Sequence, residues 1–420
     1  MAHLEYIHYK PHRPEVGSSG VVWALEASVR PVERLPQIFW ANGEPWPEVN
    51  LWALEMGRNR EVKIKTIQSA LEHLHKYANW LEQEEIDWRH FPQTKADRVL
   101  VRYRGALIEA RDCGALRPST TTHRMNAVIR FYRYAAGRHF ISRDAPKWQD
   151  KSVVLRYFDS AGFERTMSRI TTDISIPNRA RPGVRLEDGL LPLTKQHMTE
   201  LLQFAKENVS EELYLMLLVG CFTGARIGTI TTLKVQTLDD AVRDPMVPGM
   251  WMVSVGPGTG VSTKFDVSGH LMIPEQLMTI LKAYVASRRH LDRVIKATNA
   301  HKSYLFLTRH NKPYKVAAVD REMVNLRRAS HASGLKFLQK FKFHQTRATY
   351  GTWLVSICLE NVSPKAALEF VKRAMHHKNE STTFGYIKFI KHTQAKIEVS
   401  NAFTEAFLGL QTRLNEVANA

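Results

Sequence analysis

The sequence predicts a mainly α-helical protein with a small β-sheet or hairpin, divided into two principal domains. The chain has 420 residues, which is too long for one ordinary hydrophobic core. Apolar residues recur at helical spacing in two regions, 56–170 and 190–400. Between these regions, residues 171–189 contain prolines, glycines and three arginines with little apolar periodicity, which is typical of a linker.

The first domain is expected to be helical. One apolar face is marked by residues three and four positions apart, namely Ile64, Ile67, Leu71, Leu74, Tyr77 and Leu81. A second helix is expected near 95–112, and a third follows Pro118. Residues 1–55 mix proline, tryptophan and polar residues, which predicts an irregular arm or small subdomain to which the sequence assigns no role.

The helix after Pro118 is basic, with aromatic residues between its charges. Arg124, Arg130 and Arg133 are candidates for contacts to DNA phosphates. A solvated basic face is the alternative, and for this helix alone it is slightly favoured. Two linker residues, Arg179 and Arg181, are further DNA-binding candidates, although a solvated loop would have the same composition.

The second domain is expected to begin near residue 190, with Thr194 capping its first helix. The apolar run within 211–222 predicts a buried helix. Residues 251–274 alternate and contain glycine turn signals, which predict a β-hairpin or small sheet. The rest is mostly helical. Residues 401–420 are expected to form a tail helix that docks on a neighbouring protomer or packs on its own domain.

The charge balance indicates a polyanionic partner. The chain has 59 Lys and Arg against 41 Asp and Glu, a net charge of +18 and a pI near 9.8. Nucleic acid is the usual partner of such a protein, and a membrane surface ranks below it because no lipidation motif or Lys-rich amphipathic terminus is present. Three cysteines without a CxxC motif, and an N-terminus without an apolar signal region, favour a reducing cytoplasm.

Three segments carry residues suited to metal-free chemistry on a phosphodiester. That chemistry requires a nucleophile, fixed cations around the phosphate and a proton donor for the leaving oxygen. Arg226 follows a Thr-Gly turn at the start of a helix. His344 and Arg347 are three residues apart, on one helix face. His377 precedes Tyr386 by nine residues. Each of these signals alone is weak.

In their order and spacing, these segments resemble the tyrosine recombinases, the family of phage integrases and Xer-type resolvases. The resemblance covers about 190–400 and extends loosely to a helical, SAM-like core-binding domain. It implies that Tyr386 attacks DNA and forms a 3′-phosphotyrosyl bond, with a Holliday junction as an intermediate. The implied catalytic set is Arg226, Lys264, His344, Arg347, His377 and the nucleophile Tyr386. In this set Arg226, Arg347 and His377 hold the phosphate, Lys264 protonates the leaving oxygen, and His344 assists proton transfer at the nucleophile.

The sequence departs from the family pattern at several positions. Thr229 replaces the usual acidic residue and Ala348 the usual histidine. His376 stands where the family has glycine. The turn after Lys264 is about two residues longer than usual for the family.

The resemblance also implies the partners. We expect double-stranded DNA with paired recombination sites, a homotetramer on that DNA, no cofactor, no metal, no membrane, and a cytoplasmic, nucleoid-associated protein. Three alternatives remain open. They are a type IB topoisomerase with the same catalytic set, a non-catalytic DNA-binding protein of the same fold, and a metal site formed by His344, His376 and His377.

Overall fold

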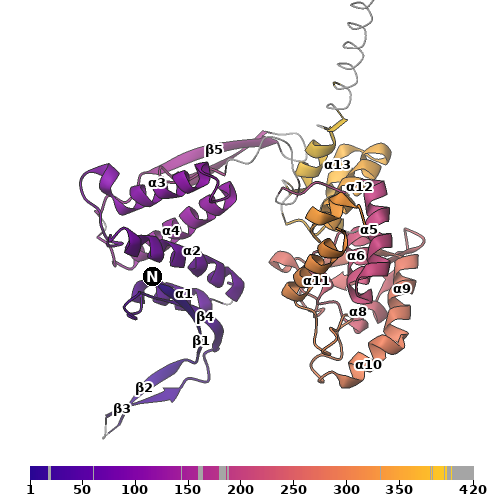
Figure 1. The fold of residues 1–420 in the computed structure, drawn as a ribbon, viewed down its shortest axis with the longest axis horizontal. Helices are drawn as coiled ribbons and strands as arrows, with labels where there is room; N and C mark the ends of the chain where they lie inside the picture. The colour runs from indigo at the N-terminus through magenta and orange to yellow at the C-terminus, as the bar shows by residue number, and fades with distance from the viewer. Residues whose placement is uncertain are drawn as a thin grey trace, which may run out of the picture. The chain divides into compact units, whose positions relative to one another are not determined.

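The structure is a computed structural model. It describes residues 1–420 except 18–19, 60, 143, 159–163, 179–185, 187–188, 332, 379, 381, 392, 395–398 and 400–420. The chain divides into two units (Figure 1). Each unit has buried hydrophobic clusters of its own. The first consists of Met1–Tyr157 with Glu164–Pro182, and the second of Phe158–Phe163 with Gly183–Ala420. No helix in the described ranges is long and apolar enough to cross a membrane.

The first unit combines four helices with three two-stranded ribbons among its described residues. The helices are α1 (Pro47–Arg58), α2 (Ile64–Gln83), α3 (Val99–Asp112) and α4 (Pro118–Gly137), with a 3₁₀ turn at η1 (Lys95–Asp97). The ribbons pair β1 (His3–Tyr9) with β4 (Val32–Phe39), β2 (His12–Gly17) with β3 (Gly20–Leu25), and β5 (Asp150–Phe158) with β6 (Glu164–Thr172).

The predicted apolar face of α2 is buried, which confirms its helical periodicity. Ile67, Leu71, Leu74 and Tyr77 are at most 1% exposed. The hydroxyl of Tyr77 lies 2.7 Å from that of Tyr132, which donates to the carbonyl oxygen of Trp88 at 2.5 Å. Buried hydroxyls need such partners, so this chain of bonds fixes α2 against α4.

Residues 1–55, predicted to be an irregular arm or small subdomain, instead form strands and a helix start that contribute to the same core. Leu35, Ile38 and Trp46 are buried with α2 and α4. Oδ1 of Asn50 on α1 accepts a hydrogen bond from the backbone N–H of Ile38 at 2.7 Å, and Nδ2 donates to the carbonyl oxygen of Ile38 at 3.0 Å. These two bonds fix β4 to α1. The proline and tryptophan content masked a strand whose apolar residues belong to the helical core.

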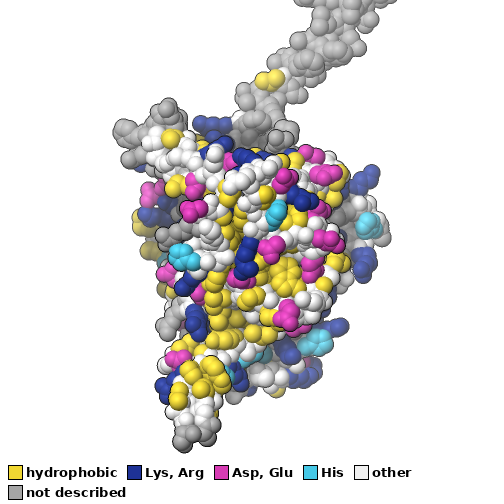
Figure 2. Space-filling model, turned by 90° about the vertical axis from the view of Figure 1, so that its left-hand side faces the viewer, with side chains coloured by type: hydrophobic (Ala, Val, Ile, Leu, Met, Phe, Trp, Pro, Cys, Tyr) yellow, Lys and Arg dark blue, Asp and Glu magenta, His cyan; other side chains and the backbone are white. Residues whose placement is uncertain are grey.

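The β2–β3 hairpin projects from this unit (Figure 1). Pro14 pairs with Trp23 and Val16 with Val21 across the ribbon. Since side chains alternate between the faces of a strand, one face is apolar. Trp23 is 65% exposed and Val16 is 85% exposed, and Figure 2 shows hydrophobic side chains gathered on this projection.

A second difference concerns residues 150–158 and 164–170, which we expected to belong to a helical domain. They lie in the two strands of the β5–β6 ribbon. The predicted linker at 171–189 also starts later, because Ile174 and Ile176 are buried in the core of the first unit. Ile174 and Ile176 are spaced by two rather than by three or four, so helical periodicity does not identify them. Arg179 and Arg181 lie outside the described residues.

The second unit is mainly helical with one small sheet, which confirms the predicted fold class. Its longer helices are α5 (Lys195–Asn208), α6 (Glu211–Thr223), α9 (Glu275–Ala286), α10 (Arg288–Lys296), α11 (Val316–Ala329), α12 (Gln345–Asn361) and α13 (Pro364–Ala374). Shorter ones are α7 (Ile227–Ile230), α8 (Val235–Asp239), η2 (Lys264–Asp266) and η3 (Lys336–Lys340). The sheet has the order β7 (Val242–Arg243), β8 (Met250–Val255), β9 (Gly269–Pro274), so the predicted hairpin is confirmed.

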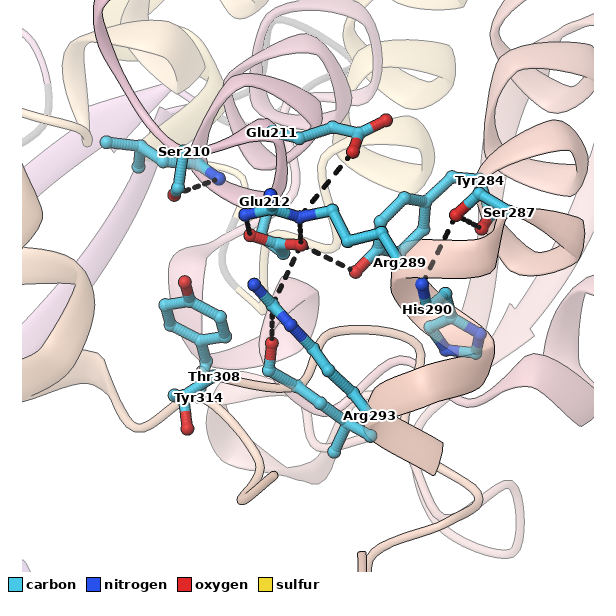
Figure 3. A network of polar contacts seen from close by, with 12 residues as sticks. Ser210, Glu211, Glu212, Tyr284, Ser287, Arg289, His290, Arg293, Thr308 and Tyr314 are labelled. Carbon is cyan, nitrogen blue, oxygen red and sulfur yellow. Dashed lines mark hydrogen bonds and ion pairs between the residues drawn. The ribbon is translucent and has the colours of Figure 1, made fainter. Parts of the chain in front are cut away.

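The apolar helix α6 is buried on nearly every side and packs against α12 (Figure 1). A polar network holds its N-terminal end (Figure 3). The buried carboxylate of Glu212 accepts hydrogen bonds from Nε of Arg289 at 2.7 Å and from the hydroxyl of Tyr284 at 3.1 Å, and forms an ion pair with Nη1 of Arg293 at 2.8 Å. Burial opposes ionisation of Glu212, but the two guanidinium groups outweigh it and lower its pKa. The network anchors α9 and α10 to α6, whose other end leads into the candidate site.

Candidate active site

Arg226 lies in the tight turn that follows α6. The helix ends at Gly224, whose φ of 63° is left-handed and favours glycine. A Cβ at Gly224 would lie 2.3 Å from Cδ1 of Tyr350, so both the turn and the space require glycine. Arg226 is the N-cap residue of α7, as predicted, and its side chain is half-buried.

Arg347 joins this turn to a segment far along the chain. The side chain is 1% exposed in α12. Its Nη1 donates to the carbonyl oxygen of Gly224 and its Nη2 to that of Met375, each at 2.6 Å. A planar guanidinium can hold two acceptors in a fixed arrangement. The turn that carries Arg226 is therefore fixed next to the residues that carry His377.

His344 is placed one helical turn before Arg347. It is the N-cap residue of α12, half-buried, with φ of −66° and ψ of −12°. Within the same helix the hydroxyl of Thr349 accepts the backbone N–H of Leu193 at 2.8 Å, which attaches α12 to the start of the second unit. The predicted proximity of His344 and Arg347 thus follows from the first turn of α12.

His377 and Tyr386 are brought together after α13. The rings of these two buried residues are stacked, with centroids 5.8 Å apart and planes inclined by 27°. Nδ1 of His377 lies 2.8 Å from the hydroxyl of Thr383, which orients the imidazole. Tyr386 belongs to the helical residues 382–391 and is 1% exposed. A Cβ at Gly351 would lie 2.4 Å from Cε1 of Tyr386, so this glycine makes room for the ring.

Lys264 is found on the connection between β8 and β9, as predicted from the sequence. It begins the η2 turn and is exposed, with Nζ 5.2 Å from the centroid of the Phe265 ring. Phe265 and Asp266 have φ values of 65° and 53°, which are unusual for residues with side chains. The longer turn noted in the sequence is thus a pair of left-handed residues next to Lys264.

His376 is a residue whose part in the site the sequence did not reveal. It is 9% exposed and has a φ of 49°. Burial lowers the pKa of His376 to about 4, with further contributions from Arg347 and Arg226. The signal that could have identified it is a histidine at a position where the family has glycine, because glycine there indicates a left-handed backbone.

The two other departures from the family pattern are also buried. Thr229 is 5% exposed and Ala348 is 0% exposed. In the parts of the chain that the structure describes, no group of three or more His, Cys, Asp or Glu side chains could hold a metal ion. His344, His376 and His377 therefore do not form the alternative metal site.

The predicted DNA-binding arginines of α4 lie in the first unit. A cavity of about 540 Å³ is lined by Arg130, Arg133, His73 and His123, among others. The two histidine rings are stacked, with centroids 6.3 Å apart, and burial followed by the charge of Arg124 lowers the pKa of His73. Arg133 also pairs with Asp150 at 3.3 Å. This concave surface carries cations suited to a phosphate backbone.

The site in the second unit combines arginines and an imidazole with a buried phenol. Guanidinium groups can hold the non-bridging oxygens of a phosphate as charge develops, and a phenol can act as a nucleophile toward phosphorus. Arg347 organises this arrangement, because its hydrogen bonds hold the two segments that carry Arg226 and His377.

Comparisons with known proteins agree with the fold. Residues 192–392 match the model of the phage integrase family. No curated protein matches the chain. The structure is similar to the Tn1549 transposon integrase in complex with circular intermediate DNA, with a TM-score of 0.51 and 17% identity over 81% of this chain and 94% of the other.

Two further solved structures are similar. A substituted form of the Tn1549 integrase in complex with transposon right end DNA has a TM-score of 0.52 and 15% identity, over 84% of this chain and 99% of the other. A lambda integrase dimer bound to a core site has a TM-score of 0.50 and 14% identity, over 81% and 94%. At these identities the similarity concerns the fold.

Proposed function

We infer that this protein, whose residues 192–392 belong to the phage integrase family, is a site-specific DNA recombinase. The observation that carries the inference is the double hydrogen bond of Arg347, which holds the Arg226 turn beside the segment of His377. Stacking of His377 on Tyr386 adds the nucleophile to the same set. The described neighbours, Tn1549 and lambda integrase, are themselves bound to DNA.

The proposed reaction begins with attack by the Tyr386 hydroxyl on the scissile phosphorus. A bond forms between the phenolic oxygen and phosphorus, and the bond to the 5′ oxygen breaks. The phenolic proton leaves through His344, and Lys264 protonates the leaving oxygen. Since Tyr386 is 1% exposed, its hydroxyl has to become accessible for this attack.

The remaining residues of the catalytic set stabilise the negative charge that develops on the phosphate. Arg226, Arg347 and His377 hold the phosphate oxygens while charge builds up on them. The free 5′-hydroxyl of a partner strand then attacks the 3′-phosphotyrosyl bond and releases the tyrosine. The phosphodiester energy is conserved in the covalent intermediate, so strand exchange through a Holliday junction needs no external energy source.

Strand exchange between two duplexes defines the partners. We propose that the protein acts on double-stranded DNA with paired recombination sites, as a homotetramer associated with the nucleoid. A net charge of +18 favours binding to this polyanion. In the first unit, the concave surface with Arg130 and Arg133 is the proposed contact to the DNA backbone.

A suicide substrate tests this function. A nick beside the scissile phosphate releases a short strand after cleavage and traps the covalent intermediate. The wild-type protein should give a covalent protein–DNA band, and Tyr386→Phe should give none. Tyr214→Phe, which removes a hydroxyl from a partly buried tyrosine of α6, is the matched control and should keep the band. A covalent band with Tyr386→Phe would contradict the assignment of the nucleophile.

A type IB topoisomerase would share the covalent step. Plasmid relaxation and recombination between two sites, measured side by side, separate the two functions. The helical first unit, with its own core and basic concave surface, favours the recombinase. Relaxation without any recombinant product would favour the topoisomerase.

A further inference from the structure

We propose that His376 is a positioning residue that holds the base of β9 and thereby fixes the loop carrying Lys264 in the active site. This proposal rests on the proposed function, because it concerns the proton donor of the cleavage step. It assigns a role to a residue outside the catalytic set that the family resemblance implies.

The first observation is a close contact between His376 and Gly269. A Cβ added to Gly269 would lie 2.5 Å from both Cδ2 and Nε2 of His376, closer than real Cβ atoms come to another side chain. Gly269 is the first residue of β9 and pairs with Val255 of β8. A bulky residue at 376 therefore requires a glycine at 269, and the imidazole lies directly on the start of the strand.

The second observation is that Gly269 and Lys264 belong to one tightly bonded turn. The hydroxyl of Thr263 donates to the carbonyl of Val267 at 2.8 Å, which closes the loop around Lys264. A Cβ at Gly256 would lie 2.8 Å from both Cα of Ser268 and the carbonyl oxygen of Val267, so the loop is packed against the end of β8. A shift of Gly269 would therefore be transmitted to Lys264, five residues earlier.

A third observation connects the same two segments at Phe265. Nζ of Lys378 lies 5.6 Å from the centroid of the Phe265 ring, and Nζ of Lys264 lies 5.2 Å from the same centroid. His376 and Lys378 thus contact the loop at two places, Gly269 and Phe265. Cation–π contacts of this kind are attractive and favour the observed placement of the loop.

The backbone at His376 supports a role for its side chain. Its φ of 49° is a conformation that glycine adopts more readily than residues with a Cβ. The segment would fold at least as well with glycine, so the contact with Gly269, and not the local backbone, gives a reason for the imidazole. Burial also lowers the pKa of His376 to about 4, which keeps the ring neutral at pH 7 beside Arg347.

The test uses the full-length protein and two suicide substrates that differ at one atom. In one the scissile phosphate has the normal 5′ oxygen, and in the other sulfur replaces it. A thiolate leaves without a proton donor because thiols are much more acidic than alcohols, with a pKa of about 8.5 for a cysteine side chain. General acids contribute about 10²–10⁴-fold to such steps. The sulfur substrate therefore bypasses Lys264.

We expect His376→Gly to remain folded, because glycine relieves the left-handed backbone while the lost packing costs stability. It should cleave the oxygen substrate at least about tenfold more slowly, a partial loss of the general-acid contribution. On the sulfur substrate it should cleave within about twofold of the wild-type rate, since the donor is bypassed. Lys264→Ala should likewise cleave the oxygen substrate slowly and the sulfur substrate at close to the wild-type rate. His376→Asn, which also tolerates a positive φ, should repeat the result and replaces the glycine variant if that one loses structure.

A second pair of variants probes the contact itself. Gly269→Ala should slow cleavage of the oxygen substrate, because the new methyl group displaces His376 or the strand. In Gly269→Ala with His376→Gly the clash is absent, so the double variant should be no slower than His376→Gly alone. Additive losses would show that the two residues do not act through their contact.

Several results would overturn the proposal. An oxygen-substrate rate for His376→Gly within about twofold of wild type would leave His376 without a role. If His376→Gly slows cleavage of both substrates equally, His376 does not act on the proton donor. If Lys264→Ala also slows both substrates equally, Lys264 is not that donor. If the wild-type protein forms no covalent adduct with either substrate, the proposed function fails instead.

Discussion

Replacement of Arg347 by lysine tests whether this side chain holds the site together as well as supplying charge. The guanidinium spans two carbonyl oxygens at 2.6 Å each, and a single ammonium group cannot reproduce that fork. At least one buried carbonyl, of Gly224 or Met375, loses its partner. A hydrogen bond from a charged donor contributes about 1.5–3 kcal/mol, so we expect the free energy of unfolding of Arg347→Lys to fall by that amount.

Thermal unfolding of the full chain measures this loss. For a unit of about 150–250 residues, 1 kcal/mol corresponds to about 2–4 °C, so the transition of the second unit should fall by about 3–12 °C. Arg226→Lys is the control, because the Arg226 side chain is half-buried at a helix start and should cost less than about 1 kcal/mol. Both variants should lose covalent adduct. Equal melting temperatures for the two variants would refute the structural role of Arg347.

Three further predictions concern the buried network, the nucleophile and DNA binding. Glu212→Gln should destabilise the protein by about 3 kcal/mol at pH 7, whereas the exposed Glu211→Gln should cost less than about 1 kcal/mol. Because the pKa of Glu212 is lowered in the folded state, its contribution is present above about pH 4.3 and is lost as pH falls through the folded pKa. If denaturant unfolding shows a Glu212→Gln difference that stays constant as pH falls well below about 4.3, this prediction is contradicted. Gly351→Ala should cost about 1–3 kcal/mol by overpacking and reduce covalent adduct, while Gly228→Ala, whose Cβ would meet no atom within 4 Å, should retain wild-type adduct. Wild-type adduct formation by Gly351→Ala would exclude the close packing against the nucleophile. Arg130→Ala should weaken DNA binding uniformly across sequences and reduce the slope of log K against log salt by about 1, and an unchanged slope would exclude a phosphate contact.

The helices and turns that carry the candidate site could be predicted because their signals are local. His344 and Arg347 are related by one helical turn, and the turn before Arg226 is encoded by Gly224. The bridging role of Arg347 could not be predicted, since its two acceptors lie 123 and 28 residues away in sequence. Contacts over such separations depend on the packing of α6 against α12, which periodicity does not describe.

The sequence-based predictions of secondary structure were wrong mainly where the chain forms β-strands. The first 55 residues were expected to be an irregular arm or small subdomain, because they mix proline, tryptophan and polar residues, and Pro36 lies within β4 itself. Residues 150–158 and 164–170 were assigned to a helical domain, although they lie in the strands of the β5–β6 ribbon. Short strands bury few residues each, so their alternation is easily missed beside strong helical periodicity. The contact between His376 and Gly269 was missed for another reason, since it joins residues 107 positions apart.

The β2–β3 hairpin provides the protein with a spectroscopic reporter of its own. Of nine tryptophans, Trp23 is 65% exposed on a projecting two-stranded ribbon. An indole in water emits at longer wavelength and is accessible to ionic quenchers, whereas indoles such as that of Trp46, 1% exposed, are shielded. The difference spectrum between wild type and Trp23→Phe therefore isolates the hairpin. It allows any burial of this ribbon during assembly on DNA to be followed in real time without a chemical label.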